Sequence, residues 1–369
     1  MTDTTDQATL KASPPLIRVL LVDDSPLARE LLRDVLERDP RLTVVGVAGN
    51  GLEGVAAAQR LQPDVVVMDV HMPELDGYAA ARRIMETAPT RIVMVTATTR
   101  PDDVADTFRT LEAGALVVLP KPTGPGSADF TMLVKEFLST VRLMAEVPVV
   151  RRWPMRTAAP PLPPPRHLPA HVRVIALGAS TGGPQALRDI LIRLPKNLAV
   201  PLLIVQHISS AFTDGFAEWL GDASGYPVHV AQAGQLVRNG IAYLAPAGKQ
   251  MGLRPDGVID LVDAPSEHGV LPAISYLFRS MATGFGRASV GVLLTGMGRD
   301  GALELKAMRE AGAVTIAQDA ASSIVFGMPG EAIRLNAATH VLAPPDIATM
   351  ITRLAGHQAH APNHKESTQ

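Results

Sequence analysis

The chain of 369 residues contains no cysteine. This absence excludes disulfides, thiolate nucleophiles and cysteine-ligated zinc or iron–sulfur sites. It is also consistent with a protein of the reducing cytoplasm. No uncharged apolar run reaches the roughly 18 residues that a transmembrane helix needs, so we expect no membrane insertion. The polar N-terminus also lacks the apolar stretch of a signal peptide. We therefore expect a cytoplasmic protein.

Neither sign of charge is in clear excess. The chain has 34 Lys and Arg against 36 Asp and Glu, for a formal net charge of −2. A nucleic-acid partner would favour a basic patch or stripe, and none is evident in residues 172–355. Nucleic acid is therefore not an expected partner.

Proline is concentrated in one stretch, with eight prolines between residues 147 and 170. Proline fixes φ and removes a backbone donor, so this stretch is predicted to be a semi-rigid linker. It separates a first domain, 15–146, from a second, 171–355. The polar ends, 1–14 and 356–369, are predicted to be disordered tails.

Both halves alternate apolar runs with amphipathic segments, which predicts an α/β protein with two doubly wound parallel sheets. In the first half, this pattern predicts strands at 17–22, 43–47, 64–69, 91–96 and 116–119, with helices near 26–38, 51–61, 76–87, 103–113 and 128–146. In the second half, it predicts strands at 172–178, 201–206, 289–294 and 314–317, with helices at 184–193, 213–221, 273–283 and 300–311. Residues 226–262, with turns at Asn239-Gly240 and Asp256-Gly257, resemble short strands of an antiparallel hairpin insert.

Five polar residues follow or end strands of the first domain: Asp23, Asp24, Asp69, Thr96 and Lys121. The carboxyl ends of parallel strands meet at one edge of a sheet, so these side chains should converge there. Three carboxylates in one pocket favour a hard cation such as Mg²⁺. One carboxylate could then accept a phosphoryl group, with the lysine and threonine contacting that group. Single strand-end aspartates often only cap helices, but all five in this order indicate a phosphoryl site.

The second half contains a Gly-x-Ser-x-Gly turn at 178–182, between a predicted strand and a predicted helix. This context is typical of a sharp turn that presents a nucleophilic serine, here Ser180. A base and an acid are also needed, and His207 and Asp300 both follow predicted strands. Asp319 competes for the acid role on spacing alone.

Two other interpretations of this turn are disfavoured. A dinucleotide site would need a glycine where Ser180 stands, and an acidic residue where Gln206-His207 ends the next strand. An α/β-hydrolase would have the order serine, acid, histidine, which Ser180, Asp300 and His340 satisfy. However, His340 begins an apolar run, which places it at the opposite edge of the sheet.

The first half resembles response-regulator receiver domains over residues 17–122. The resemblance rests on Val-Asp-Asp-Ser-Pro, on Met-Asp-Val-His-Met-Pro-Glu-Leu-Asp-Gly and on Leu-Pro-Lys-Pro. It implies that Asp69 is the phosphorylation site and that Thr96 and Lys121 are switch residues. It also implies a Mg²⁺ site made by Asp23, Asp24, Asp69 and the backbone carbonyl of His71.

The second half resembles the catalytic domain of chemotaxis-type protein-glutamate methylesterases. The matching segments are Leu-Gly-Ala-Ser-Thr-Gly-Gly-Pro at 177–184, Ile-Val-Gln-His at 204–207, Tyr-Leu-Ala-Pro-Ala-Gly at 243–248, Leu-Leu-Thr-Gly-Met-Gly-Arg-Asp-Gly at 293–301, and Ala-Gln-Asp-Ala-Ala-Ser-Ser-Ile-Val-Phe-Gly-Met-Pro at 317–329. The chain departs from the family at Pro272-Ala273-Ile274-Ser275, where Pro-Ser-Val-Asp is common. Lys249-Gln250 also stands where a histidine is frequent.

The resemblance implies a serine esterase that hydrolyses glutamate γ-methyl esters on chemoreceptors and also deamidates receptor glutamines. Ser180 would be the nucleophile, His207 the base and acid, Asp300 the orienting carboxylate, and the Met297 backbone N–H the oxyanion donor. The esterase itself would need no cofactor. A histidine kinase of the chemosensory array would phosphorylate Asp69, and phosphorylation would open an active site covered by the receiver.

Overall fold

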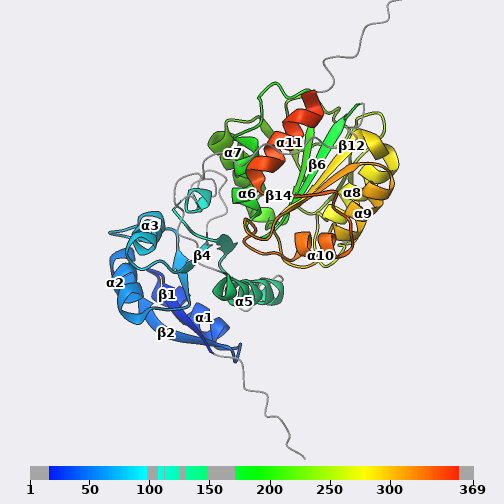
Figure 1. Cartoon of the computed structure of the whole chain (residues 1–369). Coiled ribbons are helices and arrows are strands. Elements are labelled where there is room, and N and C mark those ends of the chain that lie inside the picture. Colours follow the sequence, from blue (N-terminus) through cyan, green and yellow to red (C-terminus); the bar gives the residue numbers. More distant parts are fainter. Residues whose placement is uncertain are drawn as a thin grey trace, which may run out of the picture. The chain divides into compact units, whose positions relative to one another are not determined.

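Figure 1 shows the computed structural model, which describes residues 16–97, 107–111, 113–122, 124, 130–147 and 171–356. The predicted tails, nearly all of the proline-rich linker, and residues 103–106 and 112 of the predicted helix at 103–113 lie outside the described residues. Contacts divide the chain into two compact units, Met1–Thr96 with Ala113–Arg151, and Ala97–Glu112 with Arg152–Gln369. Among the helices described, none is long and apolar enough to cross a membrane.

The first unit contains a five-stranded parallel sheet, as predicted. Its strands are β1 (Ile17–Val22), β2 (Leu42–Ala48), β3 (Val65–Asp69), β4 (Arg91–Thr96) and β5 (Val117–Pro120), in the order β2-β1-β3-β4-β5. Every residue of the central strand β3 is buried, so helices must cover both faces.

Among the described residues, the helices that accompany this sheet are α1 (Pro26–Leu36), α2 (Gly51–Leu61), α3 (Gly77–Thr87) and α5 (Phe130–Glu146). Helix α2 packs against α3, and α1 packs against α5. The first three helices begin where a short polar side chain accepts a hydrogen bond from the first turn: Ser25 from Ala28 N, Asn50 from Glu53 N, and Asp76 from Ala79 N. These caps satisfy backbone donors that the helix leaves unpaired.

The second unit contains a seven-stranded parallel sheet in the order β14-β13-β12-β6-β7-β9-β8. Its strands are β6 (Val174–Ala179), β7 (Leu202–Gln206), β8 (Val228–Val230), β9 (Ala242–Leu244), β12 (Ser289–Leu293), β13 (Val314–Gln318) and β14 (His340–Leu342). The three central strands β12, β6 and β7 are buried along their whole length. They therefore form the middle layer of the unit.

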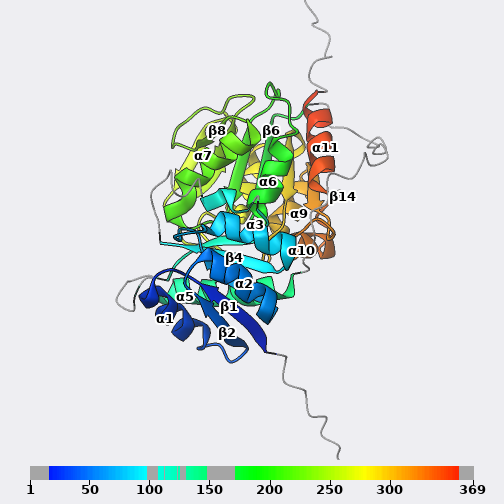
Figure 2. The same cartoon turned by 90° about the vertical axis from the view of Figure 1, so that its left-hand side faces the viewer.

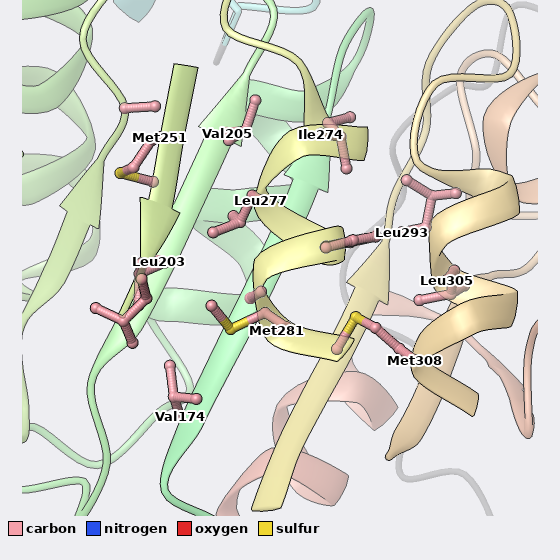
Figure 3. Packing of buried hydrophobic residues seen from close by; sticks show 14 of the residues in the cluster. Val174, Leu203, Val205, Met251, Ile274, Leu277, Met281, Leu293, Leu305 and Met308 are labelled. Atoms are coloured by element: carbon pink, nitrogen blue, oxygen red, sulfur yellow. The ribbon is translucent and has the colours of Figure 1, made fainter. Parts of the chain in front are cut away.

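Helices cover the two faces of this sheet (Figures 1 and 2). One group contains α6 (Gly183–Leu191), which packs against α7 (Thr213–Ser224) and α11 (Pro344–Gly356). The other group contains α8 (Ile274–Gly284), which packs against α9 (Ala302–Glu310). Helix α9 also contacts α10 (Met328–Arg334). Figure 3 shows the core under α8, where Leu277 belongs to one buried cluster with Leu203 and Val205 of β7. In the first turn of α8, the Ile274 side chain lies against Gly178 of β6, where an added Cβ would strike it. The helix that covers the middle of the sheet therefore starts close to the ends of its central strands.

The predicted hairpin insert at 226–262 is correct only in its second part. Strands β10 (Gln250–Leu253) and β11 (Ile259–Val262) form an antiparallel pair around the turn at Asp256-Gly257. Strands β8 and β9 instead pair in parallel and extend the main sheet next to β7. The turn at Asn239-Gly240 therefore makes no hairpin, because the chain crosses over between β8 and β9 before it pairs.

The second unit also contains a cluster of aromatic rings on α7. The ring of Phe108, in the segment between β4 and β5, lies 5.1 Å from Phe216 and 5.5 Å from Trp219, measured between ring centroids. Phe212, which precedes α7, lies 6.2 Å from Phe108 in an edge-to-face arrangement. Such aromatic pairs add to the stabilisation that burial alone provides.

Candidate active site and phosphoryl site

Ser180 stands in the turn between β6 and α6. Its N–H donates to the Thr295 carbonyl (3.0 Å), and its carbonyl accepts from Gly183 N (2.7 Å). Gly182 has a φ of +79°, a conformation that side chains disfavour, and Pro184 lies in the first turn of α6. The sequence therefore places a partly buried serine at the carboxyl edge of the sheet, beside a helix N-terminus with its positive potential.

His207 follows the neighbouring strand in register with Ser180. Ala179 pairs with Gln206 between β6 and β7, so the next residues of the two strands emerge side by side. The His207 N–H donates to the Ala179 carbonyl (3.0 Å), and its ring Nε2 lies 2.9 Å from Asp300 Oδ2. A carboxylate only accepts, so Nε2 carries the hydrogen and Nδ1 is left as the acceptor.

Asp300 is almost fully buried, and its carboxylate accepts four hydrogen bonds. Oδ2 accepts from the His207 ring and from Ile274 N (2.7 Å), while Oδ1 accepts from Ser275 N (3.0 Å) and Ser275 Oγ (2.5 Å). Burial raises the pKa of Asp300, but the hydrogen bond and charge of His207, with the bonds from Ser275 and Ile274, hold it below the ordinary value. Asp300 therefore remains ionised and fixed in orientation.

The structure thus brings Ser180, His207 and Asp300 together, but it lacks one of the two hydrogen bonds of a catalytic triad. Within residues 171–356, as the structure describes them, the Ser180 hydroxyl makes no hydrogen bond to His207. Catalytic hydrogen bonds are often long or unformed until substrate binds. The roles of Ser180, His207 and Asp300 in a triad therefore stay a prediction that this geometry supports.

The loop 295–301 lines the site with backbone groups. A Cβ added at Gly296 would lie 2.6 Å from the Ser180 Cβ and would also strike the Met328 side chain, so only glycine fits. The next N–H, that of Met297, donates no hydrogen bond within the described part of the second unit. It is therefore available to an oxyanion, and its role as oxyanion donor stays a prediction.

The two alternative residues lie elsewhere. Asp319 Oδ1 accepts from the N–H of Ser322 (2.9 Å) and from its hydroxyl, so this carboxylate closes its own turn. His340 begins the edge strand β14, which β13 and β12 separate from β6. Burial lowers the pKa of His340. Neither side chain has a described contact with His207.

Sequence reasoning missed one group at the site. The side-chain amide of Gln206 donates to two backbone carbonyls, those of Ser180 (2.9 Å) and His207 (2.9 Å). One buried amide therefore holds the backbone of both residues in place. Its position directly before His207, at the end of an otherwise apolar strand, was the available signal.

The acidic pocket of the first unit also assembles as predicted. The carboxylates of Asp23, Asp24 and Asp69 offer oxygens within 4.8 Å of one another. Lys121 Nζ lies 2.7 Å from Asp23 Oδ2 and 2.9 Å from Asp69 Oδ2. Thr96 is buried at the end of β4. Three hard oxygen donors at this spacing fit a divalent cation such as Mg²⁺.

Electrostatics in this pocket are coupled. Burial raises the pKa of Asp69, and the ammonium group of Lys121 only partly offsets this effect. For Lys121, burial lowers the pKa, but the hydrogen bonds and charges of Asp23 and Asp69 outweigh this effect. The pKa of Lys121 therefore lies above its ordinary value. The lysine therefore stays protonated beside Asp69. The His71 side chain is exposed, in agreement with a contribution through its backbone alone.

Comparisons with known proteins match both halves of the chain. Residues 19–128 match the response regulator receiver domain, and residues 175–351 match the CheB methylesterase domain. Among solved structures, the catalytic domain of Thermotoga maritima CheB methylesterase is 32% identical, with a TM-score of 0.48 over 50% of this chain and 98% of that one.

Curated relatives are similar over almost the whole chain. The protein-glutamate methylesterase/protein-glutamine glutaminase 4 of Geobacter metallireducens is 49% identical over 344 residues, which cover 92% of this chain and 99% of that protein. The corresponding protein 1 of Syntrophus aciditrophicus is 47% identical over 350 residues, covering 93% and 100%. With a receiver domain before its catalytic domain, the chain belongs to the CheB methylesterase family.

Proposed function

We propose that this protein is a phosphorylation-activated protein-glutamate methylesterase that removes γ-methyl esters from glutamates of chemoreceptors. It acts in the cytoplasm, within a chemosensory two-component pathway. The observation that carries the proposal is the buried His207–Asp300 pair (2.9 Å), one strand away from Ser180 and in register with it. The relatives that match over the whole chain, with their printed activity, support the same reaction.

The geometry suggests how each group would act. His207 Nδ1 takes the proton of Ser180 as Oγ attacks the ester carbonyl carbon, and Asp300 stabilises the resulting imidazolium. The Met297 N–H and the N-terminus of α6 stabilise the oxyanion. The tetrahedral intermediate collapses to an acyl-enzyme as His207 protonates the leaving methoxide, which departs as methanol. Water, deprotonated by His207, then attacks the acyl carbon, and the bond to Ser180 Oγ breaks as the imidazolium returns its proton to Oγ, which releases the glutamate.

Deamidation of receptor glutamines would follow the same route. An amide passes through an equivalent tetrahedral intermediate, and the protonated His207 would deliver its proton to the leaving nitrogen, which departs as ammonia. The site needs no further residue for this second reaction, so we propose it as an additional activity of the same serine.

We infer that control resides in the acidic pocket. Asp69 would accept a phosphoryl group from a histidine kinase, with Mg²⁺ held by Asp23, Asp24, Asp69 and the His71 carbonyl. The metal and Lys121 would neutralise the added charge, which is consistent with the donor set. Thr96 would contact the added phosphoryl group, and the phosphorylated first unit would in this way set the activity of the catalytic domain.

The test is methanol release from methylated chemoreceptor membranes, with and without a small phosphodonor and Mg²⁺. We expect release that the phosphodonor stimulates and that Ser180→Ala abolishes. Retained release in the Ser180→Ala variant would place the nucleophile elsewhere. If the wild type releases nothing although Asp69 is phosphorylated, the protein is a receptor-binding adaptor rather than an esterase for that receptor.

A further inference from the structure

Ser275 holds the oxygen of Asp300 that does not face His207. It lies in the first turn of α8, is completely buried, and contacts Asp300 Oδ1 through both its N–H (3.0 Å) and its hydroxyl (2.5 Å). Its Oγ also accepts from Gly301 N (3.0 Å) and lies 2.8 Å from Glu304 Oε2. One hydroxyl therefore lies between two acidic side chains and the start of α9.

The hydroxyl has only one hydrogen to donate, so it can serve one of the two carboxylates at a time. The contact with Asp300 is the shorter, which assigns the hydrogen to Asp300. Glu304 is in turn 3.7 Å from Arg279, whose guanidinium is paired with Glu267. The titratable groups that face the His207–Asp300 pair through Ser275 are thus Glu304 and, beyond it, this Arg279–Glu267 pair.

We propose that Ser275 is a positioning residue for the reaction: its hydroxyl fixes the plane and the charge of Asp300, and through Asp300 the orientation of His207. The inference rests on the proposed esterase function. It also gives a role to the position at which the chain departs from the Pro-Ser-Val-Asp pattern, since a neutral donor here supports the carboxylate that a second carboxylate would repel.

The direction of the effect follows from the hydrogen bonds. A donor to Oδ1 stabilises the negative charge of Asp300. Without that donor, Asp300 accepts the Nε2–H of His207 more strongly, so the signal of this hydrogen in proton nuclear magnetic resonance should move downfield. A carboxylate free to rotate also orients the ring less well, which lowers kcat. A side chain that only filled space would leave the Nε2–H signal where it is.

The experiment compares Ser275→Ala and Ser275→Cys with the wild type in the full chain. Cysteine keeps the size of the side chain but is a weak donor, so it serves if the alanine variant does not fold. We expect kcat for methanol release from methylated receptor membranes to fall about tenfold, equivalent to about 1.4 kcal/mol. KM should stay within about twofold, because Ser275 has no contact that places it against substrate. The His207 Nε2–H signal in proton nuclear magnetic resonance should move downfield in both variants.

Ser280→Ala is the matched control. Ser280 lies on the same helix, where its hydroxyl accepts from Leu253 N (3.1 Å) and donates to the Leu277 carbonyl (2.7 Å), away from Asp300. It should leave kcat and the His207 Nε2–H signal unchanged. An unchanged kcat and an unchanged Nε2–H signal in both Ser275 variants, or equal changes in Ser280→Ala, would overturn the proposal. If the wild type releases no methanol, the proposed function fails, and the Nε2–H signal still decides whether Ser275 acts on the His207–Asp300 pair.

Discussion

Replacing Asp300 by asparagine is expected to destabilise the second unit as well as to stop the reaction. All four groups that face the carboxylate are donors: the His207 ring, the backbone of Ile274, and the backbone and hydroxyl of Ser275. An asparagine has only one acceptor oxygen. Whichever way its amide is turned, its NH₂ group faces two of these donors, and at least two hydrogen bonds are lost.

The magnitude follows from the number of bonds. A hydrogen bond to a charged group contributes about 1.5–3 kcal/mol, so two lost bonds should cost about 3–6 kcal/mol of unfolding free energy. No discount for solvent applies, because Asp300 is only 3% exposed.

The loss should depend on pH. Burial raises the pKa of Asp300, but His207, Ser275 and Ile274 together hold it below its ordinary value of 3.8. A lowered carboxyl pKa stabilises the fold above the ordinary value, and this contribution is lost as the pH falls through the folded value. Asparagine does not titrate, so the difference in unfolding free energy between wild type and variant should become smaller as the pH falls below about 4.

Urea unfolding of the full chain at several pH values measures this difference in unfolding free energy. Of the two tryptophans, Trp219 is buried on α7 in the second unit and Trp153 belongs to the predicted linker, so the fluorescence change on unfolding follows the second unit. Asp319→Asn is the control, because its single amide oxygen can still accept both hydrogen bonds from Ser322. It should change the unfolding free energy by less than about 1 kcal/mol. Equal midpoints for Asp300→Asn and wild type, or a gap that does not change with pH, would refute the reasoning.

Three further predictions concern access and control. Gly296→Ala should lose most of its methanol release, because the new Cβ would lie 2.6 Å from the Cβ of Ser180. In the control Gly221→Ala the nearest atom to the new Cβ lies at 3.7 Å, so this variant should stay active. Equal methanol release by the two variants would contradict this packing argument. Asp69→Asn should keep basal methanol release but lose stimulation by a phosphodonor, and a stimulated variant would exclude Asp69 as the acceptor. Proteolysis within 147–170 should release a constitutively active catalytic domain; a cut enzyme no faster than the intact unphosphorylated one would argue against inhibition by the receiver.

Most of the central strands could be predicted from the sequence for one physical reason. A parallel strand covered on both faces is apolar along its whole length, so Val65–Asp69 and Leu202–Gln206 stand out as short apolar runs. The residues directly after such runs then lie at one edge of the sheet. The candidate site followed from this rule, since Ser180, His207 and the acidic pocket all stand at strand ends.

Short edge elements could not be predicted in the same way. Strands β8 and β9 have three residues each, too few to show a period, and a turn such as Asn239-Gly240 does not fix the direction in which the flanking strands pair. Their parallel pairing comes from docking beside β7. Helix α10 and strand β14 were not predicted as elements for the same reason, since 7 and 3 residues are too few to show a period. Helix α11 was also not predicted, although its buried Ile347, Met350, Ile351 and Leu354 follow helical spacing and were an available signal.

The role of Asp300 shows what tertiary structure adds. An aspartate directly before a helix is ordinarily interpreted as its N-cap. Here Gly301, with a φ of +79°, takes the N-cap position of α9, and the Asp300 carboxylate instead binds the first N–H groups of α8, whose own N-cap residue makes no side-chain cap. The same carboxylate therefore caps the N-terminus of α8 and orients His207.

Stability and catalysis are consequently coupled at Asp300 but separable at Ser180. In the described residues the Ser180 hydroxyl donates no hydrogen bond, so Ser180→Ala removes a reactive group without leaving a described partner unpaired. Its unfolding free energy should stay within about 0.5 kcal/mol of the wild type, while activity is lost. Urea titration beside the methanol assay checks this, with Asp300→Asn as the contrasting variant. A loss of several kcal/mol in Ser180→Ala would mean that the serine, too, is held by the fold rather than left free for substrate.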